Sequence, residues 1–339
     1  MQIVAPLEDR PLRIVMPGGS GQIGQMLARH FQRSGHHVTV LTRGPYSAPW
    51  QTVHWDGETL GPWVETLEAA DICINLTGHT INCRPTHANR QAIYLTRIGS
   101  TRLLHEAIAT LATPPRLWMN ASAATIYKRK VDAQRVDLPL DESCEPESDQ
   151  AGVRSAVPEP WAVARGFIQR TVRDWESAFF GTETPLTRKI ALRSGITLSP
   201  TPGNVFAVLS NLVRAGLGGS AGSGRQYIPW IHEADFAQAI DFLIAREDLS
   251  GPFNLTAPIP AQNRQFMEVL RDAWNRPNGL PAPAFAVWLG GWIMGSNPEL
   301  VLSSCRAIPG RLLHEGFTFE FPDCPEAAED LVRQWKSRR

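Results

Sequence analysis

Three glycines near the amino terminus have a spacing that suits the binding of phosphate groups. Gly18, Gly21 and Gly24 lie three residues apart in the run PGGSGQIG. Glycine adopts backbone dihedrals that other residues resist, and its missing side chain lets backbone amides approach an anion. If a helix begins here, its first N–H groups and its dipole favour negative charge. We therefore expect a diphosphate at this turn, with an empty glycine turn as the alternative. The glycines expected to line it are Gly18, Gly19 and Gly21.

The segments on either side of the glycines must supply a strand and a helix. Leu12–Met16 is a short apolar run typical of a buried strand. Ile23, Leu27 and Phe31 recur at the spacing of one helical face, and Ser34-Gly35 ends the pattern. This order of strand, glycine turn and helix favours phosphate binding over an empty turn.

Arg43 follows the second predicted strand, His37–Thr42. In dinucleotide-binding folds this position contacts the adenosine ribose, where a carboxylate accepts a hydrogen bond from the 2′-hydroxyl of NAD. A guanidinium instead binds a 2′-phosphate through two donors, so Arg43 favours NADP, with NAD and a solvated arginine as alternatives. Asp56, after a third strand at Thr52–Trp55, can accept a hydrogen bond from the adenine amino group or form a turn before Gly57.

The rest of the chain alternates between strand and helix patterns. Further strands are expected at Ile72–Leu76, Arg116–Ala121, Lys189–Leu198, Tyr227–His232 and Phe253–Thr256, and helices at Asn89–Leu111, Phe167–Phe180 and Phe206–Ala215. This predicts an α/β fold, a doubly wound parallel sheet with helices on both faces. We expect an NAD(P)-binding Rossmann domain over 12–200 and 225–257. A smaller substrate lobe should comprise 201–224 and 258–339.

Two other stretches carry weaker predictions. The acid-rich stretch Lys128–Pro160 is expected to be a surface excursion. The tail from Pro258 should hold two or three helices and a short strand at Phe317–Phe321. Trp288 and Trp292 lie four residues apart, as in a helix that packs its tryptophans inward.

The composition argues against several classes of protein. Lys plus Arg equals Asp plus Glu at 33 each, so no broad basic field attracts nucleic acid or a membrane surface. The five cysteines form no Cys-x-x-Cys pair, and His36-His37 has no carboxylate or thiol pattern beside it, so we expect no metal site. The apolar stretch Pro283–Met294 is too short to span a bilayer. We expect a cytoplasmic protein.

Several segments together resemble a known family. The glycine turn, Asn75-Leu76-Thr77-Gly78 and Ser122-Ala123 resemble the extended short-chain dehydrogenases/reductases. Within these, the chain is most similar to epimerase-family proteins of the SDR39U1 and YfcH type, which carry a C-terminal domain of unknown function (DUF1731). The segments that carry this resemblance are Arg173–Glu176, Leu192–Gly195, Gly216–Gly219, Gly222–Gln226, Trp230–His232, Arg306–Pro309, Arg311–Leu313 and Gly316-Phe317.

The resemblance implies an NADP-dependent oxidoreductase or epimerase with a small, phosphorylated or nucleotide-linked substrate. Its cofactor site would add Ser20, Gln22, Ile23, Asn75, Leu76, Thr77, Gly78 and Pro200 to the glycines and Arg43. Extended members use a Tyr-x-x-x-Lys pair for proton transfer, but the helix here reads FIQRTV. A non-catalytic NADP(H)-binding sensor or scaffold is therefore the alternative.

The resemblance also assigns roles to residues outside the cofactor site. Ser122 and Tyr127 are the candidate catalytic hydroxyls, with a purely structural role as the alternative. Arg225 is the candidate partner of a substrate phosphate, or else a solvated loop arginine. His232 is expected to be buried and hydrogen-bonded, and Asp235 to cap a helix. A homodimer is compatible with the family.

Overall fold

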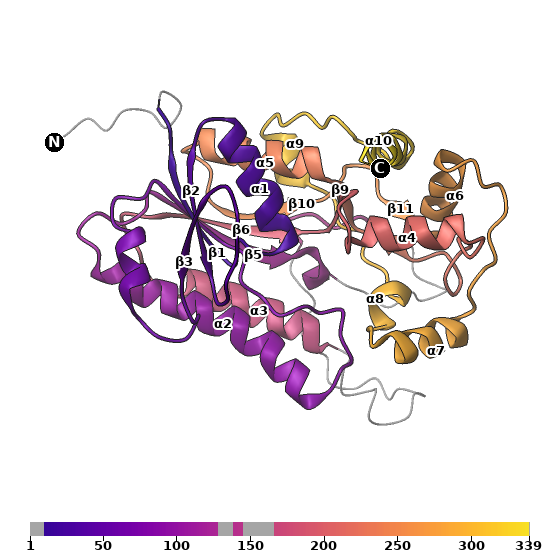
Figure 1. Cartoon of the computed structure of the whole chain (residues 1–339), viewed down its shortest axis with the longest axis horizontal. Coiled ribbons are helices and arrows are strands. Elements are labelled where there is room, and N and C mark those ends of the chain that lie inside the picture. Colours follow the sequence, from indigo (N-terminus) through magenta and orange to yellow (C-terminus); the bar gives the residue numbers. More distant parts are fainter. Residues whose placement is uncertain (1–9, 128–137, 145–165, 339) are drawn as a thin grey trace.

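The computed structural model describes residues 10–127, 138–144 and 166–338. Its main sheet has seven parallel strands in the order β10-β6-β5-β4-β1-β2-β3 (Figure 1). In chain order these are β1 (Arg13–Pro17), β2 (His37–Thr42), β3 (Gln51–His54), β4 (Ile72–Asn75), β5 (Leu117–Ala123), β6 (Arg188–Ser194) and β10 (Gly251–Leu255). The strand order reverses at β1, which confirms the predicted doubly wound α/β fold.

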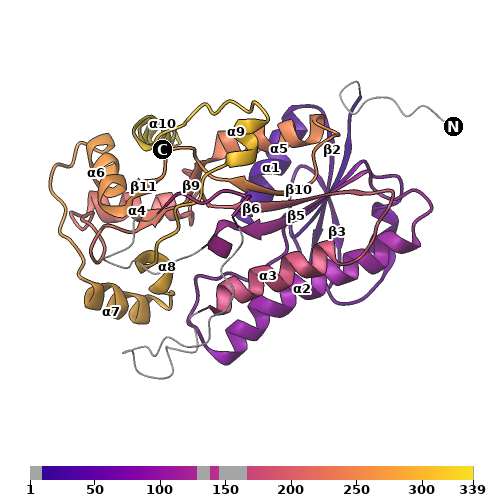
Figure 2. The same ribbon diagram turned by 180° about the vertical axis from the view of Figure 1, so that it is seen from behind.

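Helices cover both faces of this sheet. On one face lie α1 (Gln22–Arg33) and α5 (Glu233–Ala245), and on the other α2 (His87–Thr110) and α3 (Phe167–Phe180) (Figures 1 and 2). Successive side chains of a strand point to opposite faces. Ile14 and Met16 therefore join the core under α1, whereas Val15 joins the core under α2. Two 3-10 helices, η2 (Pro62–Thr66) and η3 (Ala124–Tyr127), complete this part of the chain.

Beyond β6 the chain leaves the main sheet. A short strand, β7 (Ile196–Leu198), pairs with β9 (Trp230–His232), while β8 (Tyr227–Ile228) pairs with β11 (Ala261–Gln262). The predictions of single strands over Lys189–Leu198 and Tyr227–His232 were therefore wrong, since they divide at Gly195 and Pro229. A Cβ atom on Gly195 would lie 2.5 Å from the Pro229 carbonyl oxygen, so the two backbones approach too closely for any side chain.

The lobe at the carboxyl end of the sheet is mostly helical (Figure 1). Its helices are α4 (Val205–Arg214), α6 (Asn263–Ala273), α7 (Ala284–Met294), α8 (Glu299–Leu302) and α10 (Cys324–Ser337). Helix α9 (Gly310–His314) instead packs on β10, and its Leu312 belongs to the core of the main sheet. Phe206, Leu270 and Leu331 belong to one core that joins α4, α6 and α10. The tail after Pro258 thus holds more helices than predicted.

Phe317–Phe321 does not form the predicted strand. The backbone amides of Glu320 and Phe321 instead donate to the buried Asp235 carboxylate, at 2.7 and 3.1 Å. Asp235 therefore anchors the tail and does not cap α5, contrary to expectation. His232 is the cap, because its Nδ1 accepts a hydrogen bond from the Ala234 amide at 3.1 Å.

Helix α7 differs from its prediction in orientation. Trp288 and Trp292 were expected to pack inward, yet their exposed fractions are 36% and 65%. The buried position of the helix is Gly291, where an added Cβ would lie 2.6 Å from the Pro298 ring. The small residue allows close contact on the inner side and leaves the large apolar side chains outside. Among the described residues, no helix is long and apolar enough to cross a membrane.

Candidate cofactor and active site

The glycine turn follows β1 and leads directly into α1. Gly18 has a φ of 74°, in the left-handed region that favours glycine, and an added Cβ would lie 2.8 Å from the Thr77 backbone. A Cβ on Gly24 would lie 2.4 Å from the Gly19 Cα. These glycines are therefore required by backbone packing. Gly21 differs, because the nearest atom to its Cβ position is 3.4 Å away and the residue is exposed.

The amino terminus of α1 carries the partial positive charge of an uncapped helix. Its N-cap residue is Gly21, no side chain caps the helix, and its first turn contains no acidic residue. The helix dipole and the first amide groups are thus left for an external anion. The exposed Gly21 gives that anion close access to the backbone. The geometry of this turn therefore fits a diphosphate.

The segment after β4 lies directly against the glycine turn. Thr77 packs its backbone on Gly18, and its Oγ1 atom is buried without a hydrogen-bond partner among the described residues. Asn75 is fully buried, accepting from the Thr77 amide at 3.1 Å and donating to Asn120 Oδ1 at 2.7 Å. Asn75 therefore holds the backbone of the segment that packs on the turn. Thr77 and the exposed Gly78 lie next to the expected diphosphate.

Arg43 lies at the carboxyl end of β2 and is exposed. No described residue pairs with its guanidinium. Its neighbour Thr42 donates to Ser20 Oγ at 3.3 Å, which ties this loop to the glycine turn. The structure thus brings the free Arg43 cation to the edge of the expected cofactor site.

Asp56 has a different environment from the one expected of an adenine ligand. Its carboxylate accepts hydrogen bonds from the Thr59 hydroxyl and from the amides of Glu58 and Thr59. These bonds lower the pKa of Asp56 to about 2. The side chain forms the local turn that the sequence offered as the alternative role.

The loop at Pro200 reaches the glycine turn through Gln22. Asn204 donates to the Gln22 side-chain oxygen at 3.5 Å, and the Asn204 oxygen accepts from the Ser199 amide at 3.2 Å. Pro200 itself is buried at the carboxyl end of β7. The structure therefore places the Ser199–Asn204 loop beside the first turn of α1.

Ser122 and Tyr127 belong to a buried polar network at the carboxyl end of β5. Ser122 Oγ donates to Glu176 Oε1 at 2.6 Å. Arg193 on β6 donates to both Glu176 oxygens at 2.8 and 2.7 Å, and its Nη1 donates to the Tyr127 hydroxyl. Burial raises the pKa of Tyr127 to about 12. Both predicted hydroxyls are therefore present together, but each is already bonded within the protein.

Arg225 lies outside this group, on the loop before β8. Its side chain is exposed, no described residue pairs with its guanidinium, and its backbone amide donates to Ser223 Oγ at 3.3 Å. Arg264 shares this loop, because its guanidinium donates to the Ser223 carbonyl at 3.2 Å. The two arginines form a basic edge of the lobe.

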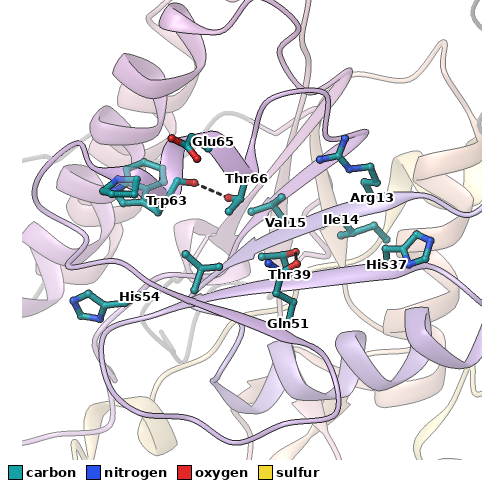
Figure 3. A pocket seen from close by; sticks show the side chains of 12 residues that line it. Arg13, Ile14, Val15, His37, Thr39, Gln51, His54, Trp63, Glu65 and Thr66 are labelled. Atoms are coloured by element: carbon teal, nitrogen blue, oxygen red, sulfur yellow. Dashed lines mark hydrogen bonds between the residues drawn. The ribbon is translucent and has the colours of Figure 1, made fainter.

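A hollow on the sheet face opens between the first three strands of the chain and η2 (Figure 3). Arg13, His37, Gln51, Trp63 and Glu65 are among its lining residues. None of the residues predicted for the cofactor or the substrate lines it. The hollow is therefore separate from the glycine turn.

Comparisons with known proteins agree with this geometry. Residues 14–255 match the profile of the NAD dependent epimerase/dehydratase family. The chain belongs to that family. Residues 282–331 match DUF1731, a domain of unknown function, so the resemblance drawn from the sequence was correct. The epimerase-family chain is also 30% identical over 325 residues to an "Epimerase family protein" of Staphylococcus aureus strain N315, covering 94% of this chain and 99% of that one.

Solved structures extend the comparison. The human epimerase family protein SDR39U1, in a crystal structure with NADPH, is 26% identical with a TM-score of 0.79, covering 95% of this chain and 99% of that one. A nucleoside-diphosphate sugar epimerase from Corynebacterium glutamicum is 26% identical with a TM-score of 0.71, covering 96% of this chain and 59% of that one. Both support the Rossmann-like NAD(P)-binding fold of this epimerase-family chain.

Several residues of the site were not predicted from the sequence of this epimerase-family chain. Glu176 and Arg193 appeared only within matching segments, although an arginine inside an apolar strand run is itself a sign of a buried carboxylate. Glu142 was assigned to the surface excursion, yet its half-buried carboxylate accepts from the amides of Asn254 and Arg311 at 2.7 and 3.1 Å. That prediction was therefore wrong for Leu140, which is buried, and for Glu142, whereas Leu138, Pro139 and Ser143 are exposed as expected. The remainder of Lys128–Pro160 lies outside the described residues.

Proposed function

We propose that this chain binds NADP(H) at the Gly18–Gly24 turn and exchanges a hydride between its nicotinamide and a small polar substrate. The observation that carries the proposal is the uncapped start of α1 beside a glycine turn whose packing excludes side chains. The turn lies at the carboxyl ends of the strands, next to the point where the strand order reverses. The NADPH in the structure of the human relative supports the same cofactor.

The preference for NADP rests on Arg43. An NAD-specific fold places a carboxylate at the end of the second strand, and here the acidic candidate nearby, Asp56, is used in its own turn. The unpaired guanidinium of Arg43 supplies the charge that a 2′-phosphate requires.

The substrate would enter between the sheet edge and the lobe. When bound, the nicotinamide supplies or accepts the hydride, and the protein supplies orientation and hydrogen-bond donors. Ser122 and Tyr127 are the hydroxyls that would handle the substrate oxygen, with Arg193 holding the Tyr127 hydroxyl in place. Arg225 would contact a substrate phosphate or nucleotide from the lobe, as in an oxidoreductase or epimerase that acts on a phosphorylated compound.

Cofactor binding can be tested by titrating the protein with NADPH and NADH and following nicotinamide fluorescence. Wild-type protein should bind NADPH more tightly than NADH. Arg43→Ala should weaken NADPH about tenfold or more, the value expected for a charge-assisted hydrogen bond, and should leave NADH nearly unchanged. Arg33→Ala, an exposed arginine in the last turn of α1, is the matched control. Equal NADPH affinity in wild type and Arg43→Ala would refute the role of Arg43.

A second candidate is a non-catalytic NADP(H)-binding sensor or scaffold. None of the four tyrosines of the chain is followed by lysine four residues later, and both Ser122 and Tyr127 are buried within the polar network. Turnover assays with carbonyl compounds and nucleotide sugars distinguish the two. Tight NADPH binding without any turnover would favour the sensor, whereas mass spectrometry of co-purified metabolites would identify a substrate.

A further inference from the structure

Arg97 on α2 lies behind the segment that contacts the glycine turn. An ideal Cβ on Gly78 would be 3.1 Å from Arg97 Cζ and 3.2 Å from Nη2, so the guanidinium packs directly against this glycine. Nη1 donates to the carbonyl oxygens of His79 and Ile93 at 2.9 and 3.1 Å. The Trp175 ring lies 5.3 Å from Cζ. These contacts fix the position of the guanidinium.

The charge of Arg97 has no carboxylate partner among the described residues. Burial lowers the pKa of Arg97 to about 10, which still leaves the side chain charged at neutral pH. Carbonyl oxygens and an aromatic face offset a cation only in part, so an unpaired, partly buried charge is unfavourable in the free protein. Such a charge calls for an anion that the polypeptide itself does not provide.

A second arginine on the same side of the sheet shows the contrast. Helix α3 presents Glu176 to Arg193 and, one residue earlier, the neutral Trp175 to Arg97. The fold thus neutralises Arg193 with a bidentate carboxylate and leaves Arg97 positive. Both arginines lie near the carboxyl edge of the sheet, but only Arg97 lies against the Thr77-Gly78 segment that packs on the glycine turn.

Two polar groups without a partner and one cation without a counter-charge lie along this junction. They are the uncapped amino terminus of α1, the buried Thr77 Oγ1 without a partner among the described residues, and the Arg97 cation. Thr77 packs on Gly18, and Gly78 packs on Arg97, so the groups follow one another across two adjacent residues. All of them favour negative charge or a hydrogen-bonding oxygen.

We propose that Arg97 is a cofactor-binding residue whose charge balances the diphosphate of the dinucleotide. The inference rests on the proposed function, because it assigns a further residue to the same site. It predicts that Arg97 acts on the diphosphate, which NADPH and NADH share, whereas Arg43 acts on the 2′-phosphate, which only NADPH carries. The two arginines should therefore be separable by choice of ligand.

The test measures dissociation constants of NADPH, NADH and adenosine 2′-monophosphate, the last by competition with NADPH fluorescence. Arg97→Gln should weaken NADPH and NADH alike, about tenfold or more, and leave adenosine 2′-monophosphate nearly unchanged. Arg97→Lys should recover part of the loss, since the ammonium retains the charge. Arg43→Ala should weaken NADPH and adenosine 2′-monophosphate and spare NADH. Arg102→Gln, an exposed arginine on the same helix, is the control.

Thermal unfolding without ligand separates binding from a structural role. If Arg97 serves the ligand, Arg97→Gln should unfold at the wild-type temperature or above it, because an unpaired cation has been removed. A lower unfolding temperature with unchanged NADH affinity would overturn the inference. Failure of the wild-type protein to bind any dinucleotide would overturn the proposed function as well, whereas equal binding by wild type and Arg97→Gln would overturn the role of Arg97 alone.

Discussion

Two regions at the carboxyl edge of the sheet differ in whether their polar groups have partners within the protein. Around Ser122, every polar side chain of the Glu176–Arg193 network bonds to another member. Around Gly18, a helix terminus, the Thr77 hydroxyl and Arg43 lack protein partners among the described residues, and Arg97 has carbonyl partners but no carboxylate. In the first region, which we call the complete region, every polar side chain has a partner without a ligand. In the second, which we call the incomplete region, the missing partners can come only from a ligand. The comparison indicates that stability depends on the first region and binding on the second.

The largest effect should follow from breaking the complete region. Glu176→Gln leaves the Arg193 guanidinium buried without a counter-charge, which should lower the free energy of unfolding by about 3–5 kcal/mol. The affinity for NADPH should hardly change. Urea unfolding and calorimetric titration measure the two quantities, and Glu176→Gln/Arg193→Met should recover part of the stability. Unchanged stability of Glu176→Gln, or a loss of NADPH affinity as large as the loss of stability, would contradict the comparison.

A smaller loss of stability is expected from the incomplete region when its backbone is altered. Gly24→Ala places a Cβ 2.4 Å from the Gly19 Cα, so the turn must open. This should cost about 1–3 kcal/mol of stability and remove NADPH binding. Gly99→Ala on α2 is the matched control, because no atom lies within 4 Å of its Cβ position. That control should gain about 0.5–1 kcal/mol, and tight NADPH binding by Gly24→Ala would contradict the assigned site.

The smallest effect on stability should come from Thr77→Val. The hydroxyl has no partner among the described residues, so replacing it with a methyl group of the same shape should change the free energy of unfolding by less than about 1 kcal/mol. NADPH affinity should nevertheless fall, because the cofactor loses a hydrogen-bond partner. Ser122→Ala is the corresponding change in the complete region and should affect stability more than binding. Equal NADPH affinity in wild type and Thr77→Val would remove Thr77 from the site.

The sequence predicted the local features of the fold well. The glycine turn, Arg43 and most strands of the main sheet depend on nearby residues, whose spacing and propensity are visible in the chain. Sequence could not show where β6 and β7 divide, because Gly195 is required by a backbone 34 residues later, at Pro229. The same limit applies to the tail, where Asp235 takes the amides that a strand would have used.

The site shows a similar division. The turn residues were found because their glycines carry a local signature, whereas Arg97 and Glu176 depend on contacts between distant segments. An arginine inside an apolar strand run, such as Arg193, indicates a buried carboxylate but does not identify it, and no sequence pattern shows that Arg97 faces a tryptophan ring. Trp175 and Glu176 occupy adjacent positions of α3, so only the packing of that helix decides which arginine is neutralised.

The hydrogen bonds that Asp235 accepts from the tail limit how the two family segments of this protein can evolve. Family matches divide the chain into an epimerase segment and a DUF1731 segment, as though the second were an attachment. Yet the carboxylate inside the first segment is satisfied by amides of the second, and Phe206 shares a core with Leu331. Separating the two segments would leave the buried Asp235 carboxylate without hydrogen-bond donors and would expose an apolar surface. The two are therefore one folding unit, and evolution could exchange neither without changing the other.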